Sequence, residues 1–277
     1  MRLIIPIFLS MNNLKKITAL VAALVVAPSV LAAPVFQYKH TAKSVVVTPA
    51  STDTASPSGS GGATPAPPVT TPPVDVEPTP IPDPYRANVT SLLHLDGTAV
   101  DGTGSATSAP GVTFAKGKFG QAGVFGAGYV SGSNMYDLTK PTWTAEMWIF
   151  PTAANGALMG QYAASDAQWF WSMGTNNMAF AGATFTFPNG ISLNNWHHVA
   201  LVRNSGVTTA YVDGVRSGVS TSAAITMRGS GVLWGSGWFG PRMSNPFNGM
   251  IDEIRLTGGV ARYTTPTFTP PAGPSAN

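Results

Sequence analysis

The chain has 277 residues, and only 10% of them are charged, well below the share of about a quarter that soluble domains usually carry. Three of its 15 basic residues and none of its 12 acidic residues precede residue 33, so the remainder holds 12 of each sign, and this balance argues against a nucleic-acid partner. The chain has no cysteine, which excludes disulfides and thiolate metal sites.

Residues 1–32 are expected to be a secretory signal peptide. Lys15 and Lys16 precede an apolar run over residues 17–27, and small residues occupy positions −3 and −1 of a cleavage site after residue 32. The run is shorter than the roughly 20 residues that span a bilayer, so we expect no membrane span after cleavage; an uncleaved anchor is the alternative. Met11 could be the true start. The protein is then secreted or at the cell surface, in a bacterial periplasm or outside the cell, or on a virion. The lack of cysteine favours such a bacterial or phage source.

Residues 33–84 are expected to form a disordered, low-complexity linker or stalk. Pro, Thr, Ser and Gly dominate residues 48–84, which cannot offset their ordering entropy by burial. The Pro-rich part should be extended and the Gly/Ser part flexible. Residues 34–47 could contact a protein partner, but nothing in the sequence fixes their role.

Residues 85–277 show short apolar or alternating runs separated by Gly, Asn, Asp and Pro, which predicts an all-β, two-sheet antiparallel jelly-roll sandwich. Asp213-Gly214 between two such runs predicts a tight hairpin, because its turn needs positive φ at both central positions. The predicted strands lie near residues 91–96, 119–125, 143–150, 157–162, 168–173, 178–181, 196–203, 207–213, 215–220, 231–235 and 250–256.

Several blocks recur in an order that resembles a known family: SLLHLDGT, FGQAGVFGAGYV, TAEMWIFPT, NNWHHVALVRNSGVTTAYVDGVRSG and FNGMIDEIRLTGGVARYTTPTFTPP. Together they resemble the laminin-G-like jelly rolls of the concanavalin A-like lectin/glucanase superfamily, in the version found in phage tail and bacterial surface proteins. The resemblance spans residues 91–271. It implies the fold more than the function, because this fold serves lectins, glucanases, adhesion modules and spacers.

Catalysis of the glucanase type is not expected. Such enzymes carry an E-x-D-x-x-E pattern that places carboxylates on one face of a strand. Here residues 85–277 contain only two glutamates, Glu146 and Glu253, and neither has a carboxylate two or four positions away. A Ser-His-Asp site is not excluded by counting, but the G-x-S-x-G pattern of a nucleophile elbow is absent.

Two acidic residues are candidate ligands of a structural calcium ion. The resemblance implies that an Asp on the last strand, with an acid or a carbonyl near the first strand, binds Ca²⁺. Asp252 and Asp96 match those positions. The alternative is that these residues cap a turn or pair with Arg255, since two acids alone do not make a calcium cage.

Two aromatic clusters are candidate sugar sites, because sugars are held by aromatic faces and a few polar groups. Trp169 and Trp171 share one face of a predicted strand; the alternative is that both are core residues. The segment 236–247, expected to be a loop with its aromatic side chains exposed, holds the second cluster: Trp238, Phe239, Arg242 and Asn245.

Three polar residues of the predicted strands are expected to be structural. His197 and His198 are adjacent, so they point to opposite faces and cannot easily bind one ion together. We expect one of them to be buried and hydrogen-bonded and the other to face the groove or solvent. Glu146 lies among apolar neighbours and should pair with Arg203 or Arg255.

The sequence therefore predicts a non-catalytic binding module for carbohydrate or another cell-surface ligand, displayed on a stalk. One alternative is a structural or adhesion protein of a surface appendage or phage virion that contacts protein rather than sugar. A glycosidase is the less favoured alternative.

Overall fold

The computed structural model describes residues 78–277 except 106, 133–136, 163–169, 227–230 and 240–241, and the side chains of 161–170 and 238–244 are outside that description. The predicted signal peptide and nearly all of the predicted linker lie outside the described residues.

Strands make up almost all of the regular structure in the described part, as predicted. One short 3-10 helix, η1 (Arg86–Asn88), precedes them. The strands are β1 (Val89–Leu93), β2 (Thr107–Ser108), β3 (Thr113–Lys116), β4 (Gln121–Phe125), β5 (Val130–Gly132), β6 (Trp143–Pro151), β7 (Gly156–Tyr162), β8 (Phe170–Met173), β9 (Asn177–Phe180), β10 (Ala183–Thr186), β11 (His197–Asn204), β12 (Val207–Val212), β13 (Val215–Thr221), β14 (Gly231–Trp234), β15 (Gly237–Phe239), β16 (Arg242–Ser244) and β17 (Gly249–Gly258).

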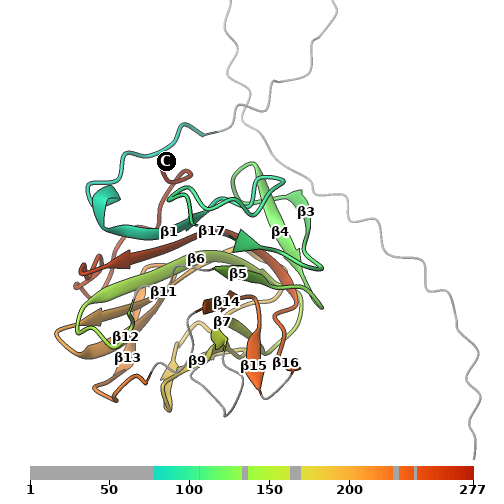
Figure 1. Ribbon diagram of the computed structural model, residues 1–277. Helices are drawn as coiled ribbons and strands as arrows, with labels where there is room; N and C mark the ends of the chain where they lie inside the picture. Colours follow the sequence, from blue (N-terminus) through green and yellow to red (C-terminus); the bar gives the residue numbers. More distant parts are fainter. Residues whose placement is uncertain (1–77, 106, 133–136, 163–169, 227–230, 240–241) are drawn as a thin grey trace, which may run out of the picture. The chain divides into compact units, whose positions relative to one another are not determined.

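These strands form two antiparallel sheets that pack face to face (Figure 1). The larger sheet has the order β13-β12-β11-β6-β17-β4-β3, with β1 also pairing with β17, and the other has the order β10-β9-β8-β7-β14-β5-β2. Strands at the centre of each sheet pair with strands distant in sequence, such as β6 with β17 and β7 with β14, as in a jelly roll. β15 and β16 form a separate two-stranded hairpin.

The hydrophobic core lies between the two sheets and follows the two-residue period of the strands. Along β6, alternate side chains starting at Trp143 enter the core, whereas Thr144, Glu146 and Trp148 belong to the outer face of the larger sheet. Large aromatic side chains fill the core, and burying each one contributes on the order of 2–3 kcal/mol. The largest are Trp143, Trp171, Trp234, Phe180, Phe185 and Phe247.

The outer face of the larger sheet is covered in part by the chain that follows β17. Residues 261–268 of this chain are called the covering segment below. Ala261, Tyr263 and Phe268 pack on a small apolar cluster that includes Val202 and Tyr211 of β11 and β12. The covering segment is therefore part of the domain's packing. This arrangement creates the buried contacts and the pocket described below.

The predicted hairpin at Asp213-Gly214 is confirmed. Asp213 has a φ of 49° and Gly214 a φ of 77°, the two positive values that a two-residue turn between β12 and β13 requires. At Gly214 a side chain would also overlap the carbonyl of Phe268 in the covering segment. Glycine is therefore needed there for both backbone conformation and space.

Two parts of the predicted organisation are corrected. The segment 236–247 is not simply a loop, because β15 and β16 pair within it. The linker does not extend to residue 84: Ile81 exchanges backbone hydrogen bonds with the C-terminal segment, and the carboxylate of Asp83 is nearly buried between Arg255 and Arg262. The domain therefore includes residues before 85.

Candidate functional site

The outer face of the larger sheet carries a buried charge network around Glu146. Arg255 Nε donates to Glu146 Oε1 at 2.9 Å, which confirms one of the two partners expected for Glu146, and His198 Nε2 lies 3.2 Å from Oε2. Tyr263 Oη donates to Glu146 Oε2 at 2.5 Å. Burial alone would raise the pKa of Glu146, but the positive charge of Arg255 and the other contacts hold that pKa well below its usual range.

The same network binds the ends of the domain to the sheet. Arg262 of the covering segment donates to both carboxylate oxygens of Asp83, at 2.9 and 2.6 Å, and Arg255 also contacts Asp83 at 3.2 Å. The carboxylates of Glu146 and Asp83 are thus each shared by two arginines. Both carboxylates therefore have a structural role in ion pairs, which leaves them unsuited to acid–base catalysis.

Tyr211, Tyr263 and Phe268 form an aromatic stack beside that network. Tyr263 lies flat on Phe268, with ring centroids 3.6 Å apart and planes 3° from parallel, and Tyr211 meets Phe268 edge-on at 5.4 Å. The hydroxyl of Tyr211 donates to the backbone carbonyl of Tyr263 or Thr265, each at 3.2 Å. The stack thereby fixes the covering segment against β12.

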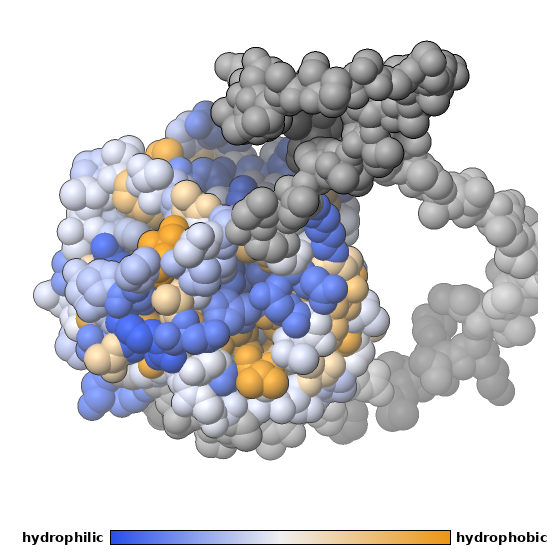
Figure 2. Space-filling view, turned by 90° about the horizontal axis from the view of Figure 1, so that it is seen from above, coloured by the Kyte–Doolittle hydropathy of each residue, from blue (hydrophilic) through white to orange (hydrophobic). Residues whose placement is uncertain are grey.

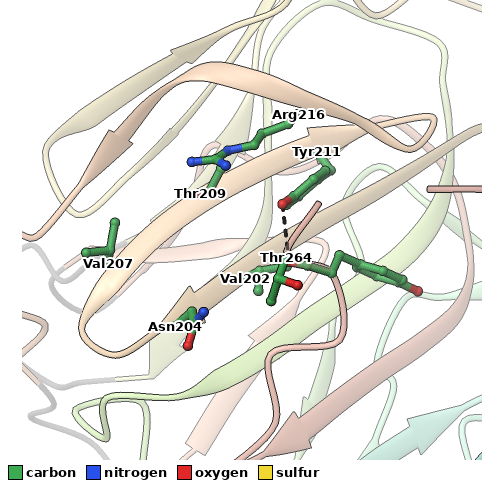
Figure 3. Close-up of a pocket in the computed structure, with 8 residues that line it drawn as sticks. Val202, Asn204, Val207, Thr209, Tyr211, Arg216 and Thr264 are labelled. Carbon is green, nitrogen blue, oxygen red and sulfur yellow. Dashed lines mark hydrogen bonds between the residues drawn. The ribbon is translucent and has the colours of Figure 1, made fainter. Parts of the chain in front are cut away.

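A pocket of about 260 Å³ opens where the covering segment leaves the sheet exposed (Figure 3). Figure 3 shows Arg216 and Tyr211 side by side on β13 and β12, with Asn204 and Val207 towards the other end of the pocket. The wall combines aromatic, aliphatic, amide, hydroxyl and guanidinium groups. They belong to Val202, Asn204, Val207, Thr209, Tyr211, Arg216, Tyr263 and Thr264.

Several polar groups of this pocket have no partner within the described part of the chain. No hydrogen bond or ion pair there uses the Arg216 guanidinium, and none uses the hydroxyls of Thr209 and Thr264 or the amide nitrogen of Asn204. Arg216, Asn204 and Thr264 are exposed. A ligand with hydroxyl or acidic groups could therefore replace their water without breaking existing bonds.

The two predicted calcium ligands meet at one turn, between β3 and β4. Asp252 Oδ2 accepts hydrogen bonds from the backbone N–H groups of Lys118 and Phe119, at 2.9 and 3.0 Å, and Asp96 Oδ1 accepts from that of Gln121 at 2.6 Å. Both residues thus hold the turn, as the alternative interpretation expected. Neither of them pairs with Arg255, whose partners lie elsewhere.

Asp252 also retains an unused oxygen. Its side chain is fully buried, and Oδ1 has no hydrogen-bond partner. Burial, helped by the nearby charges of Glu253 and Asp96, raises the pKa of Asp252 to about 8. Within the described residues no group of three His, Asp or Glu side chains gathers in a form that could hold a metal. A calcium ion here would need Asp252, Asp96 and backbone oxygens.

A Ser-His-Asp arrangement joins the 188–196 loop to the β12–β13 turn. His197 Nδ1 lies 2.7 Å from Asp213 Oδ2, and Nε2 lies 2.9 Å from Ser192 Oγ. However, Nε2 also lies 3.1 Å from the backbone carbonyl of Ser192, and hydrogen bonding to Asp213 raises the pKa of His197. Contacts on both ring nitrogens thus fasten the loop to the turn.

Both adjacent histidines are buried, so the expectation that one of them faces the groove or solvent is wrong. His197, at the start of β11, is covered by the 188–196 loop, and His198 is covered by Trp148, Tyr263 and Phe268. They do point to opposite sides of β11. The covering segment explains the burial of His198, which strand alternation alone does not reveal.

The residues of the two predicted aromatic sugar sites lie in different environments. Trp171 is a core residue whose indole N–H donates to Met178 Sδ at 3.0 Å, so it presents no aromatic face to a ligand. Trp169 lies outside the described residues. Trp238 and Phe239 belong to β15 and Arg242 to β16, but their side chains are outside the description. Asn245 is exposed and has a φ of 51°.

Sequence reasoning missed the pocket because its residues come from three separate stretches. Tyr211 and Arg216 occupy predicted strands, where they fit the usual alternation of a strand and do not stand out as site residues. The available signal was the cluster of polar and aromatic residues at those positions on both sides of the Asp213-Gly214 hairpin. The contribution of Tyr263 depends on the covering segment folding back on the sheet.

The fold and the pocket define a β-sandwich with a polar, aromatic-lined surface site. Residues 125–261 match the laminin G family model described as the concanavalin A-like lectin/glucanases superfamily. The sandwich is a laminin-G-like domain of this superfamily, which confirms the resemblance drawn from the sequence. No curated protein matches the chain.

Solved structures with a similar fold are distant in sequence. Domain 4 of AbnA, a GH43 extracellular arabinanase from Geobacillus stearothermophilus solved with arabinotriose, is 20% identical over 65% of this chain and 95% of that one, with a TM-score of 0.48. The binding domain of botulinum neurotoxin serotype D is 11% identical over 66% of this chain and 50% of that one, with a TM-score of 0.49. Trypanosoma rangeli sialidase is 14% identical over 65% and 31%, with a TM-score of 0.48.

Proposed function

We propose that the protein is a non-catalytic module that binds carbohydrate in the pocket between β11, β12, β13 and the covering segment. The observation that carries this proposal is the pocket's wall, in which the half-buried ring of Tyr263 borders unpartnered amide, hydroxyl and guanidinium groups, while Tyr211 lines the pocket as a buried residue. Sugars need both kinds of contact, since they present apolar ring faces edged by hydroxyls.

Display outside the cell is part of the same proposal. A signal peptide at 1–32 and a Pro/Thr-rich stalk would place the sandwich on a surface, where glycans are the common ligands. Within the described residues no helix is both long and apolar enough to cross a membrane. Figure 2 shows a face on which hydrophobic residues are scattered among hydrophilic ones, the pattern of a solvated surface.

The proposal that the module is non-catalytic rests on its two glutamates, which are already bound to other groups. Glu146 is tied to Arg255, His198 and Tyr263, and Glu253 accepts from Ser275 N and contacts His94 at 2.6 Å. Neither is left free to protonate a glycosidic oxygen or activate water. A broad screen of polysaccharides and activated esters should detect no turnover; hydrolysis that disappears in Ser192→Ala would contradict this.

A glycan array probed with the purified full-length protein, with and without calcium, tests the proposal. We expect binding that weakens by about tenfold when Asn204 and Thr264 are both replaced by Ala, because hydrogen bonds to sugar hydroxyls are lost. Both side chains are exposed, so the fold should be unaffected.

Trp238→Ala separates the pocket from the second candidate site, the β15–β16 hairpin. If the pocket is the site, Trp238→Ala binds the array like the unaltered protein. If Trp238→Ala loses binding and the pocket variant does not, the sugar belongs to the hairpin. No binding to any glycan, together with a protein that co-purifies, would favour the adhesion alternative.

We propose in addition that Asp252 and Asp96 hold a structural Ca²⁺ at the β3–β4 turn. The supporting observation is the buried, unpartnered Oδ1 of Asp252, which is costly without a donor or a cation. Calcium would supply a charge that both carboxylates could share, and it would stiffen the turn that they already hold.

A further inference from the structure

The pocket presents charge of one sign. Among the described residues that line it, Arg216 is the only cation, and none is a carboxylate. Burial raises the pKa of Tyr211, and burial together with Glu146 raises that of Tyr263, so both phenols are neutral at physiological pH. The pocket therefore presents a single positive charge to a ligand.

Arg216 is held in place without being neutralised. Its backbone N–H donates to the carbonyl of Pro266 at 3.0 Å, and in the β12–β13 ladder it lies opposite Tyr211. Figure 3 shows its side chain extending over β12 beside Thr209. The strand and the covering segment thus fix the origin of the side chain, while the guanidinium has no partner in the described part of the chain.

The neighbouring acids are occupied by other groups. Asp213, three residues before Arg216, contacts His197 Nδ1 at 2.7 Å and accepts from the backbone N–H of His198 at 2.9 Å. Glu146 is saturated by its own network. Within the described residues these acids are therefore not at hand to pair with the exposed Arg216.

Resting on the proposed carbohydrate function, we propose that this pocket selects a saccharide unit that carries a carboxylate, with Arg216 binding the acid. A guanidinium presents two parallel N–H groups that match the two oxygens of a carboxylate. Asn204, Thr209 and Thr264 then face the sugar hydroxyls, and Val207 contacts its apolar side. The volume of about 260 Å³ lies below the roughly 300 Å³ at which drug-sized sites begin, so the site suits one sugar unit.

The test compares matched pairs of glycans on one array. Each pair has an acidic member, ending in a uronic or a sialic acid, and the same glycan with its carboxylate reduced to an alcohol. We expect the acidic member to bind roughly tenfold to a hundredfold more tightly, because the charge-assisted bond is lost on reduction. Which acidic series binds identifies the sugar.

Variants of the protein assign the effect to Arg216. Arg216→Gln should lose the preference for the acidic member while keeping its melting temperature, and Arg216→Lys should restore the preference in part. Lys140→Gln removes the same charge at an exposed position outside the pocket lining and should leave the preference unchanged. The preference should also weaken as salt increases from 50 to 500 mM.

The outcomes separate the two proposals. Equal binding of both members of each pair, or a preference that survives in Arg216→Gln, overturns the role of Arg216 and leaves sugar binding intact. Binding to no glycan of either kind overturns the carbohydrate function itself.

Discussion

His197 illustrates how one side chain links a loop to a turn through its charge. Its ring bridges Asp213 and the carbonyl of Ser192, and the hydrogen bond to Asp213 raises its pKa above 6.5, against the opposing effect of burial. The folded protein thus binds this proton more tightly than the unfolded chain does. The stabilisation is fully present below about pH 6.5 and is lost as the pH rises through the folded-state pKa.

Asp213→Asn should remove that dependence with little change to the fold. Asn tolerates the positive φ of this turn position and can still accept from the N–H of His198. Because Asp213 is half exposed, we expect the loss below pH 6.5 to be about 1 kcal/mol or less. Urea unfolding of both proteins from pH 5.5 to 8.5 measures it. An imidazole of His197 that titrates at or below pH 6.5 by NMR would contradict the argument.

At the scale of elements, the β3–β4 turn is the place where calcium should act. If Asp252 and Asp96 hold Ca²⁺, millimolar calcium should raise the melting temperature by several degrees over EDTA, since a ligand at 100 times its Kd adds about 2.7 kcal/mol. Asp252→Asn should abolish this response. Asp137→Asn, at an exposed carboxylate elsewhere, should retain it.

An unaltered protein whose melting temperature does not move with calcium would exclude the site. In that case the raised pKa of Asp252 would describe a protonated, neutral side chain that only holds the turn. The two outcomes differ in what satisfies Asp252 Oδ1, a cation or a proton.

The strands that sequence could predict are those with a long alternation and a marked turn. β6, β11, β12 and β17 each extend over six or more residues with one face in the core, so their period is visible. β2, β3 and β5 have two to four residues, too few for a period to show, and the sheet edge defines them only after folding. β15 and β16 have three residues each and lie among Gly and Pro, so they too are too short to show a period.

The candidate site was less predictable than the fold. The sequence predicted that Glu146 would be paired, because it lies among apolar neighbours. The family resemblance predicted Asp96 and Asp252 as ligands of one ion. The sequence did not show the pocket, since Arg216 and Tyr211 become a site only where the chain after β17 returns across the sheet. Trp171 carried a stronger aromatic signal, yet alternation cannot tell a core face from an exposed one.

For the whole molecule, the Glu146 network joins the first described residues, the centre of the larger sheet and the C-terminal segment. Glu146 lies on β6, Arg255 on β17, and Arg262 and Tyr263 in the covering segment, while Asp83 precedes the first strand. Removing its central carboxylate would leave Arg255 and Arg262 to share Asp83 alone. The burial of those charges would then be only partly compensated.

Glu146→Leu should therefore lower the free energy of unfolding by about 3–5 kcal/mol, the range for breaking a buried ion pair. Asp137→Asn is the matched control: its contact with Lys140 is 3.6 Å long and exposed, so its loss should cost no more than about 1 kcal/mol. Guanidinium unfolding of both variants gives the comparison. Because the covering segment forms one wall of the pocket, Glu146→Leu should also weaken glycan binding, although Glu146 lies outside the pocket lining. Unchanged stability would mean that the segment is held by its aromatic stack alone.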